Sequence, residues 1–111
     1  MFSQDDQVWL GEQCYLDMCA GRFVNETKSV RLTWIEIRIM RCLALKLGTI
    51  VIRDNLIKSA WGEKALTEGY DFNPNELRVY ISRLRNKTED TPNNPRYLLN
   101  VPGIGYLLLP R

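Results

Sequence analysis

The sequence contains no histidine, and this absence excludes several classes of site. Histidine-dependent triads, HExxH zinc sites and Cys/His zinc fingers all need an imidazole. The three cysteines lack the Cys-x-x-Cys spacing of zinc ligands, and no phosphate-cradling P-loop or paired-carboxylate motif accompanies them. We therefore expect reduced thiols, no metal site, no cofactor and no enzymatic activity.

Long hydrophobic runs are also missing. The apolar stretches extend over only a few residues, whereas a membrane-spanning helix needs about 20. The first 13 residues, MFSQDDQVWLGEQ, are acidic and have no apolar core, so they do not resemble a signal peptide. We expect a cytoplasmic protein, and we expect no membrane contact from any part of these 111 residues.

The net positive charge is small, but it is unevenly placed along the chain. The net charge is only +2, yet the first 20 residues carry four acidic and no basic residues, which leaves +6 on residues 21–111. Residues 76–88 hold one acid against four cations. Such a stretch is either a solvated helix face or an electrostatic surface for phosphates, and its position on a helix has to decide between them.

The chain is long enough for one domain. Its 111 residues, 45% of them hydrophobic and 25% charged, have the ordinary globular balance. A chain of this size buries roughly 60–70% of its unfolded surface, which suffices for one core. We expect a single domain over residues 1–111 with its core at about 7–109.

Residues 7–32 predict a small antiparallel meander. Short β-prone segments alternate there with Gly, Asn and other turn residues. The four expected strands are Gln7–Leu10, Tyr15–Met18, Arg22–Val24 and Ser29–Leu32.

Two helices are expected next. Thr33 and Glu36 form a capping box, and apolar residues at helical spacing continue to a stop at Gly48. The apolar positions are Ile35, Ile39, Cys42, Leu43 and Leu47. A β-branched connector at 49–52 leads to a second helix, which runs from residue 53 or 54 to Trp61.

A third helix and a hairpin complete the chain. Residues 62–73 have loop composition, and Asn73-Pro74-Asn75-Glu76 then starts a helix that extends to about Thr88. Residues 96–109 predict a hairpin with a Pro-Gly turn. The predicted fold is α+β, a winged helix-turn-helix with an N-terminal four-stranded antiparallel sheet, three helices and a C-terminal β-hairpin wing.

The spacing of residues in the third helix predicts an apolar face and an opposite, mainly polar face. At 100° per residue, Leu77, Ile81, Leu84 and Tyr80 make one apolar stripe. The opposite face holds Arg78, Val79, Ser82, Arg83 and Asn86. Such a face suits a major groove: a valine contacts a thymine methyl, arginine and asparagine reach base edges, and the flanking Arg85 and Lys87 neutralise phosphates. The same face is also compatible with a solvated helix that carries one stray valine.

Four segments carry a family resemblance. They are LTWIEIRIMRCL at 32–43, IVIRDNLIKSAWG at 50–62, VYISRLRNKT at 79–88 and LNVPGIGYLL at 99–108. In this order and spacing they resemble the winged-helix effector domain of OmpR/PhoB-type response regulators, over about residues 7–109. These are bacterial two-component transcription regulators that act in phosphorelay signal transduction.

The resemblance implies binding to double-stranded promoter DNA, with the third helix in the major groove and the wing at the minor groove. Arg83 matches a base-contacting position of the family, and Val79, Ser82 and Asn86 share its face. The positions that match phosphate contacts are Trp61, Tyr80, Arg85 and Tyr106. Asn100 matches a wing position that is often Thr.

The sequence departs from the family in three places that bear on DNA. Pro102 stands where the wing commonly has an arginine, so a minor-groove cation is missing. Asn75 and Glu76 replace basic and small hydroxyl residues, and Arg78 replaces a frequent Asp. These changes affect DNA affinity and site choice more than the fold.

The resemblance also implies partners beyond DNA. The loop after the second helix is where the family is thought to touch RNA polymerase, and here it carries Glu63, Lys64, Glu68 and Asp71. Relatives bind tandem half-sites, so we expect a monomer in isolation and a homodimer on DNA. Nothing in the sequence matches the receiver domain of the family, so we expect an excised effector domain, a naturally lone one or one terminus of a longer regulator, and the two ends of the chain favour the first.

Two functions are therefore carried forward. The first is sequence-specific DNA binding for transcription regulation. The second is a winged-helix protein-interaction module with little DNA binding, which the small net charge, Pro102 and Glu76 favour.

Overall fold

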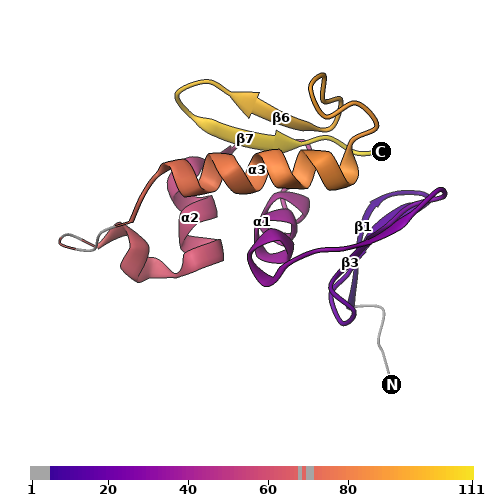
Figure 1. Cartoon of the computed structure of the whole chain (residues 1–111), viewed down its shortest axis with the longest axis horizontal. Helices are drawn as coiled ribbons and strands as arrows, with labels where there is room; N and C mark the ends of the chain where they lie inside the picture. The colour runs from indigo at the N-terminus through magenta and orange to yellow at the C-terminus, as the bar shows by residue number, and fades with distance from the viewer. Residues whose placement is uncertain (1–5, 68, 70–71) are drawn as a thin grey trace.

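The computed structural model describes residues 6–67, 69 and 72–111, and it opens with a four-stranded antiparallel sheet (Figure 1). The strands follow one another in chain order, as a meander does. They are β1 (Gln7–Gly11), β2 (Cys14–Asp17), β3 (Arg22–Val24) and β4 (Ser29–Arg31). The predicted meander is confirmed, with strand ends shifted by at most one residue.

Successive side chains of these strands point to opposite faces of the sheet, and one of the two faces is buried. Leu10, Leu16 and Phe23 are fully buried on it. Trp9 and Tyr15 are paired across β1 and β2 on the other face, with ring centroids 4.8 Å apart. The sheet thus contributes one apolar layer to the core.

Helix α1 (Trp34–Ala44) begins at the predicted capping box. The Thr33 N–H donates to Glu36 Oε1 at 2.7 Å, and the Glu36 N–H donates to Thr33 Oγ1 at 3.2 Å. The helix ends at Ala44, and a turn continues the chain to Gly48, where φ is +78°. The expected stop at Gly48 therefore marks the end of that turn.

The buried face of α1 differs from the predicted one. Ile39 and Leu43 are buried as expected, but Ile37 and Met40 are buried as well, whereas Ile35 and Cys42 are only partly buried. The sequence offered apolar residues on two overlapping faces of this helix. The packing of α1 against the N-terminal sheet, α2 and α3 selected between them.

The connector predicted at 49–52 contains a strand, β5 (Val51–Ile52). It pairs antiparallel with β7 (Gly105–Leu108), which also pairs with β6 (Leu98–Val101), so the wing sheet has the order β5-β7-β6. The approach of β5 is close: a Cβ on Gly105 would lie 2.0 Å from the Val51 carbonyl oxygen. The expected hairpin is confirmed, but its sheet has three strands where the sequence predicted two.

Helices α2 (Arg53–Trp61) and α3 (Asn75–Thr88) are confirmed. Gly62 ends α2 with φ of +94°. The Asn73 side chain accepts the Asn75 N–H at 3.0 Å, but Pro74 holds the N-cap position, so α3 begins one residue later than the predicted cap at Asn73 implies. The expected loop between the two helices begins with a 3₁₀ helix, η2 (Glu63–Leu66).

In Figure 1 the β6–β7 hairpin lies above α3, and the N-terminal sheet lies beyond α1 at the end of α3. The three helices share one core, in which Met40, Leu56, Leu77, Ile81 and Leu84 are all fully buried. None of the helices among the described residues combines the length and the apolar composition that crossing a bilayer requires.

Candidate nucleic-acid interface

Helix α3 presents the two faces that the sequence predicted. Leu77, Ile81 and Leu84 are buried in the core. The five residues of the opposite face are all exposed: Arg78, Val79, Ser82, Arg83 and Asn86. Val79 is 45% exposed, so an apolar side chain lies among cationic and hydrogen-bonding ones. The face combines the groups that read base edges with one that fits a thymine methyl.

An aromatic cluster closes one side of this face. The Trp61 ring, at the end of α2, meets the Tyr80 ring edge-on with centroids 5.5 Å apart, and Phe72 meets Trp61 at 5.0 Å. The Arg83 guanidinium carbon lies 5.0 Å from the Tyr80 ring centroid. Trp61 and Tyr80 are half-buried, so part of each ring stays open at the surface, and the Tyr80 ring is in cation–π contact with Arg83.

The two cations that flank the apolar stripe are held by the protein. Arg85 Nε donates to the Leu98 carbonyl oxygen at 3.0 Å, which ties α3 to β6. Lys87 Nζ lies 2.6 Å from Glu36 Oε1 and donates to the Arg31 carbonyl oxygen at 3.2 Å. Glu36 is fully buried, so its charge needs this lysine. Phosphate contact by either cation stays a prediction.

A hollow of about 460 Å³ separates the start of α3 from the wing. Arg78 from α3 and Arg53 from the first turn of α2 line it, together with Asn100 and Pro102 from the wing. Tyr106 lies at its floor and is only 8% exposed. The hollow brings two guanidinium groups beside the wing, and the sequence predicted neither of them there.

Arg53 is the residue that the sequence reasoning missed here. Its backbone N–H donates to the Ile104 carbonyl oxygen in the wing turn at 3.1 Å. Arg53 had been considered only as a helix start. Its position follows from the pairing of β5 with β7, which no local pattern in the sequence indicates.

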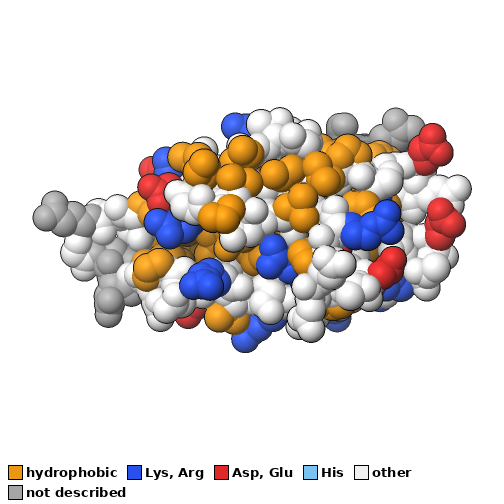
Figure 2. Space-filling view, turned by 90° about the horizontal axis from the view of Figure 1, so that it is seen from above, with side chains coloured by type: hydrophobic (Ala, Val, Ile, Leu, Met, Phe, Trp, Pro, Cys, Tyr) orange, Lys and Arg blue, Asp and Glu red, His pale blue; other side chains and the backbone are white. Residues whose placement is uncertain are grey.

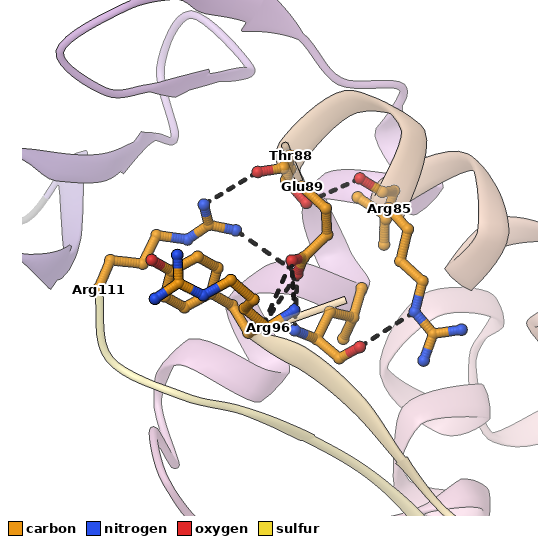
Figure 3. Close-up of polar contacts among 8 residues, drawn as sticks. Arg85, Thr88, Glu89, Arg96 and Arg111 are labelled. Atoms are coloured by element: carbon orange, nitrogen blue, oxygen red, sulfur yellow. Dashed lines mark hydrogen bonds and ion pairs between the residues drawn. The ribbon is translucent and has the colours of Figure 1, made fainter. Parts of the chain in front are cut away.

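The base of the wing is fastened to the end of α3 by a buried carboxylate (Figure 3). Glu89 directly follows α3 and is 3% exposed. Its Oε1 accepts the Arg96 N–H at 2.8 Å. Its Oε2 accepts the N–H groups of Leu98 at 2.8 Å and Tyr97 at 3.2 Å. One side chain therefore satisfies three consecutive backbone donors, that of Leu98 at the start of β6 and those of the two residues before it.

Arg111 closes the same cluster from the end of the chain. Its Nη1 donates to the Thr88 carbonyl oxygen at 2.9 Å, and its Nη2 lies 3.9 Å from Glu89 Oε2. The guanidinium carbon lies 4.1 Å from the Tyr97 ring centroid and 4.9 Å from that of Phe23. Arg111 thus links α3, the wing strand and the N-terminal sheet. The contact between Glu89 and Arg111 could not be predicted from the sequence, because the two residues are far apart in the chain and belong to no motif.

Figure 2 shows the side of the molecule that carries the wing sheet, where hydrophobic side chains gather between scattered Lys and Arg side chains. Ile50, Ile52 and Ile104 are among the large exposed hydrophobic residues. The outer surface of the wing is therefore more apolar than cationic, in line with Pro102 at its turn.

The predicted polymerase-contacting loop is described in part. Glu63 and Lys64 lie on η2 and are exposed. Glu68 and Asp71 lie outside the described residues. Contact of this loop with a polymerase stays a prediction.

The cysteines are all unpaired. Burial raises the pKa of the Cys14 thiol, and the nearby positive charge of Arg111 opposes that shift. Among residues 6–67, 69 and 72–111, no group of three or more Cys, Asp or Glu side chains is arranged to hold a metal ion.

Comparison with known proteins gives a consistent result. The family model "Transcriptional regulatory protein, C terminal" matches residues 26–108. The chain is 35% identical to the transcriptional regulatory protein KdpE of Mycobacterium tuberculosis over 91 residues, 82% of this chain and 38% of KdpE. It is 34% identical to protein PetR of Rhodobacter capsulatus over 94 residues, 85% of this chain and 40% of PetR. The chain thus spans about two fifths of the length of these relatives.

Solved structures agree with the fold. The RstA DNA-binding domain of Klebsiella pneumoniae, in complex with the RstA box, superposes with a TM-score of 0.72 at 28% identity. The match covers 90% of this chain and 94% of that domain. The response regulator DrrB of Thermotoga maritima, an OmpR/PhoB homologue, gives a TM-score of 0.72 at 26% identity over 88% of this chain and 42% of DrrB.

Proposed function

The chain belongs to the family of C-terminal domains of transcriptional regulatory proteins, of the OmpR/PhoB winged-helix type, and on that premise we propose that it binds double-stranded promoter DNA sequence-specifically. The observation that carries the proposal is the exposed, mainly polar face of α3 beside a wing, with Arg53 and Arg78 in the hollow between them. In this arrangement α3 enters the major groove and the wing reaches the adjacent minor groove.

Base readout falls to four residues of α3. Val79 contacts a thymine methyl, and Arg83 donates to a guanine edge in an orientation set by the Tyr80 ring. Asn86 and Ser82 complete the hydrogen-bonding surface. All four side chains project from one exposed face, so they reach neighbouring base pairs of one groove.

Phosphate contacts surround this readout. The proposed set combines aromatic hydrogen-bond donors with cations on both sides of the groove. Its members are Trp61, Arg78, Tyr80, Arg85, Lys87 and Tyr106. Asn100 and Pro102 face the minor groove from the wing. Because Pro102 brings no charge there, affinity depends on the cations of α3, and we expect it to be modest and strongly salt-dependent.

The test begins with random-site selection on the purified domain, followed by Kd measurements on the selected duplex. Arg83→Ala should weaken that duplex by about 1–3 kcal/mol and relax preference at one base position. Arg85→Ala should weaken all duplexes alike and reduce the slope of log Kd against log salt by about one. Arg31→Ala, an exposed arginine on β4, is the matched control and should leave both quantities unchanged. An unchanged Kd in Arg83→Ala would refute the assignment of α3.

We further propose that the domain is a monomer in isolation and that two copies occupy adjacent half-sites on DNA. Analytical ultracentrifugation of the free domain and of its complex with one-site and two-site duplexes tests this stoichiometry. A dimer in the absence of DNA, or a single copy on the two-site duplex at saturation, contradicts it.

Contact with RNA polymerase is proposed for the loop that follows α2. Its described members Glu63 and Lys64 are exposed and lie outside the DNA-facing surface of α3. Alanine at both positions should leave DNA affinity unchanged and lower transcription from a bound promoter in vitro. Equal loss of DNA binding and transcription would instead assign the loop to DNA. A cytoplasmic location is proposed because that is where bacterial promoter DNA is found.

A second candidate function is a protein-interaction winged helix. Pro102 at the wing turn and the exposed Glu76 at the start of α3 favour it, since both reduce attraction for phosphates. If random-site selection at low salt enriches no sequence, this candidate replaces the first.

A further inference from the structure

Helix α1 carries an exposed stripe on the side away from the core. Trp34, Arg38, Arg41 and Leu45 recur at intervals of four, three and four residues, so they share one line along α1 and its final turn. Trp34 is 68% exposed and Leu45 is 60% exposed, the two highest values among the exposed large hydrophobic residues. Two large apolar side chains therefore flank two arginines on an uncovered helix face.

A hollow of about 490 Å³ lies beside this stripe. Its floor includes Met18, Ile37 and Cys42, which are apolar, and its rim carries three cations, Arg38, Arg41 and Lys46. No acidic side chain is present among the described residues that line it. An apolar floor under a rim of one sign complements a partner with apolar groups and opposite charge.

The stripe and the hollow together form a groove along α1, and contacts within the protein already hold one of its side chains, Arg38, in place. Arg38 Nη1 donates to the Ala60 carbonyl oxygen at the end of α2, at 3.2 Å. The Arg38 guanidinium carbon also lies 4.9 Å from the Trp34 ring centroid, so the indole and the guanidinium are in cation–π contact. Tryptophan and arginine fixed before binding lose little conformational freedom on association, and they are the residue types that dominate binding energy at protein interfaces.

The groove points away from the surface proposed for DNA. Glu36 lies on the face of α1 opposite to the stripe, about 180° around the helix axis. It is bound to Lys87 of α3, so α3 packs on that opposite face. A duplex seated on α3 would leave Trp34 and Leu45 uncovered. Their exposure therefore has no explanation in the DNA complex.

We propose that the groove along α1 binds an acidic segment of another protein that carries large apolar side chains. The apolar side chains of that segment cover Trp34 and Leu45 and enter the hollow, while its carboxylates pair with Arg41 and Lys46 at the rim. Apolar burial supplies the affinity, and the one-signed rim selects an acidic segment over a basic one. This site is independent of DNA binding by α3.

The three tryptophans report on three separate surfaces. Trp9 lies on β1, Trp34 on the groove and Trp61 beside the recognition face of α3. Each gives its own indole N–H peak in a ¹⁵N-labelled domain. Titration with a synthetic peptide of alternating Glu and Leu should move the Trp34 peak and leave those of Trp9 and Trp61 in place. The same peptide with Lys for Glu should move none of them.

Substitutions then assign the binding energy. Trp34→Ala should weaken the acidic peptide by about tenfold or more, whereas Trp9→Ala, a matched exposed tryptophan, should leave it unchanged. Arg41→Glu is a second variant that keeps Trp34 in place and should abolish the preference for the acidic over the basic peptide. Both variants should keep the melting temperature and the duplex affinity of the parent domain.

Three outcomes would overturn the proposal. The first is equal binding of acidic and basic peptides, and the second is equal loss of affinity in Trp9→Ala. The third is movement of the Trp34 peak by duplex DNA and not by the acidic peptide, which would assign the groove to phosphates. Loss of DNA binding in Arg83→Ala tests the function of α3 and leaves this result unaffected.

Discussion

Removal of the Glu89 carboxylate is expected to destabilise the domain strongly, although this side chain lies outside the apolar core. The side chain is 3% exposed and accepts the backbone N–H groups of Arg96, Tyr97 and Leu98. Alanine leaves these donors without their acceptor and leaves Arg111 without the carboxylate at 3.9 Å. The carboxylate is not accessible to water, so solvent replaces little of what is lost.

The magnitude follows from the number of contacts. A hydrogen bond to a charged group contributes about 1.5–3 kcal/mol, and breaking a buried ion pair by removing one partner costs about 3–5 kcal/mol. These contributions share one carboxylate and do not add, so we expect Glu89→Ala to lower the free energy of unfolding by about 3–5 kcal/mol. A domain of this size has only about 5–15 kcal/mol in total.

Urea unfolding followed by circular dichroism at 25 °C measures this change. With a slope of about 1–3 kcal/mol per molar urea, the midpoint should fall by about 2 M. Asp90→Ala, at the exposed neighbouring position, is the matched control and should stay within about 0.5 kcal/mol of the parent. Glu89→Gln keeps one acceptor oxygen and should fall between the two. A loss below about 1 kcal/mol in Glu89→Ala would refute the view that this carboxylate holds the wing to α3.

Three further predictions concern other parts of the fold. Gly105→Ala should lower the free energy of unfolding by about 1–3 kcal/mol or prevent folding, because its Cβ would lie 2.0 Å from a backbone oxygen of β5. Thermal unfolding measures this change, and an unchanged stability would contradict the close approach of the two strands. Lys87→Met should cost about 1–3 kcal/mol in urea unfolding, since it leaves buried Glu36 uncompensated, a figure reduced because the Lys87 side chain is 31% exposed. Iodoacetamide followed by peptide mass spectrometry should label exposed Cys19 well before Cys14, whose raised pKa and burial disfavour the thiolate; equal rates would refute that environment.

Local sequence rules predicted most of the elements because the information for them is local. The Thr33–Glu36 capping box fixes the start of α1, and the Asn73 side chain binds the first N–H of α3, both through contacts within three residues. Gly62 ends α2 because its φ of +94° is accessible to glycine. The exposed face of α3 followed from helical periodicity alone.

The predictions that were incomplete concern contacts between distant segments. The strand Val51–Ile52 exists only because β7 pairs with it, and two residues carry no strand pattern of their own. The buried face of α1 required a choice between two apolar sets, and the neighbouring elements made that choice. Neither could be settled by the spacing of residues within one segment.

The sequence by itself determined the four-stranded meander, the three helices, the wing and the polar face of α3, since capping, turn chemistry and periodicity act over a few residues. The tertiary structure alone set the contacts between residues that are far apart in the chain. It joined Lys87 to Glu36 across 51 positions, Glu89 to the base of the wing, and Arg53 to the wing turn. The reason is physical: a buried carboxylate binds whichever donors the fold brings within about 3 Å, and chain separation places no limit on that choice.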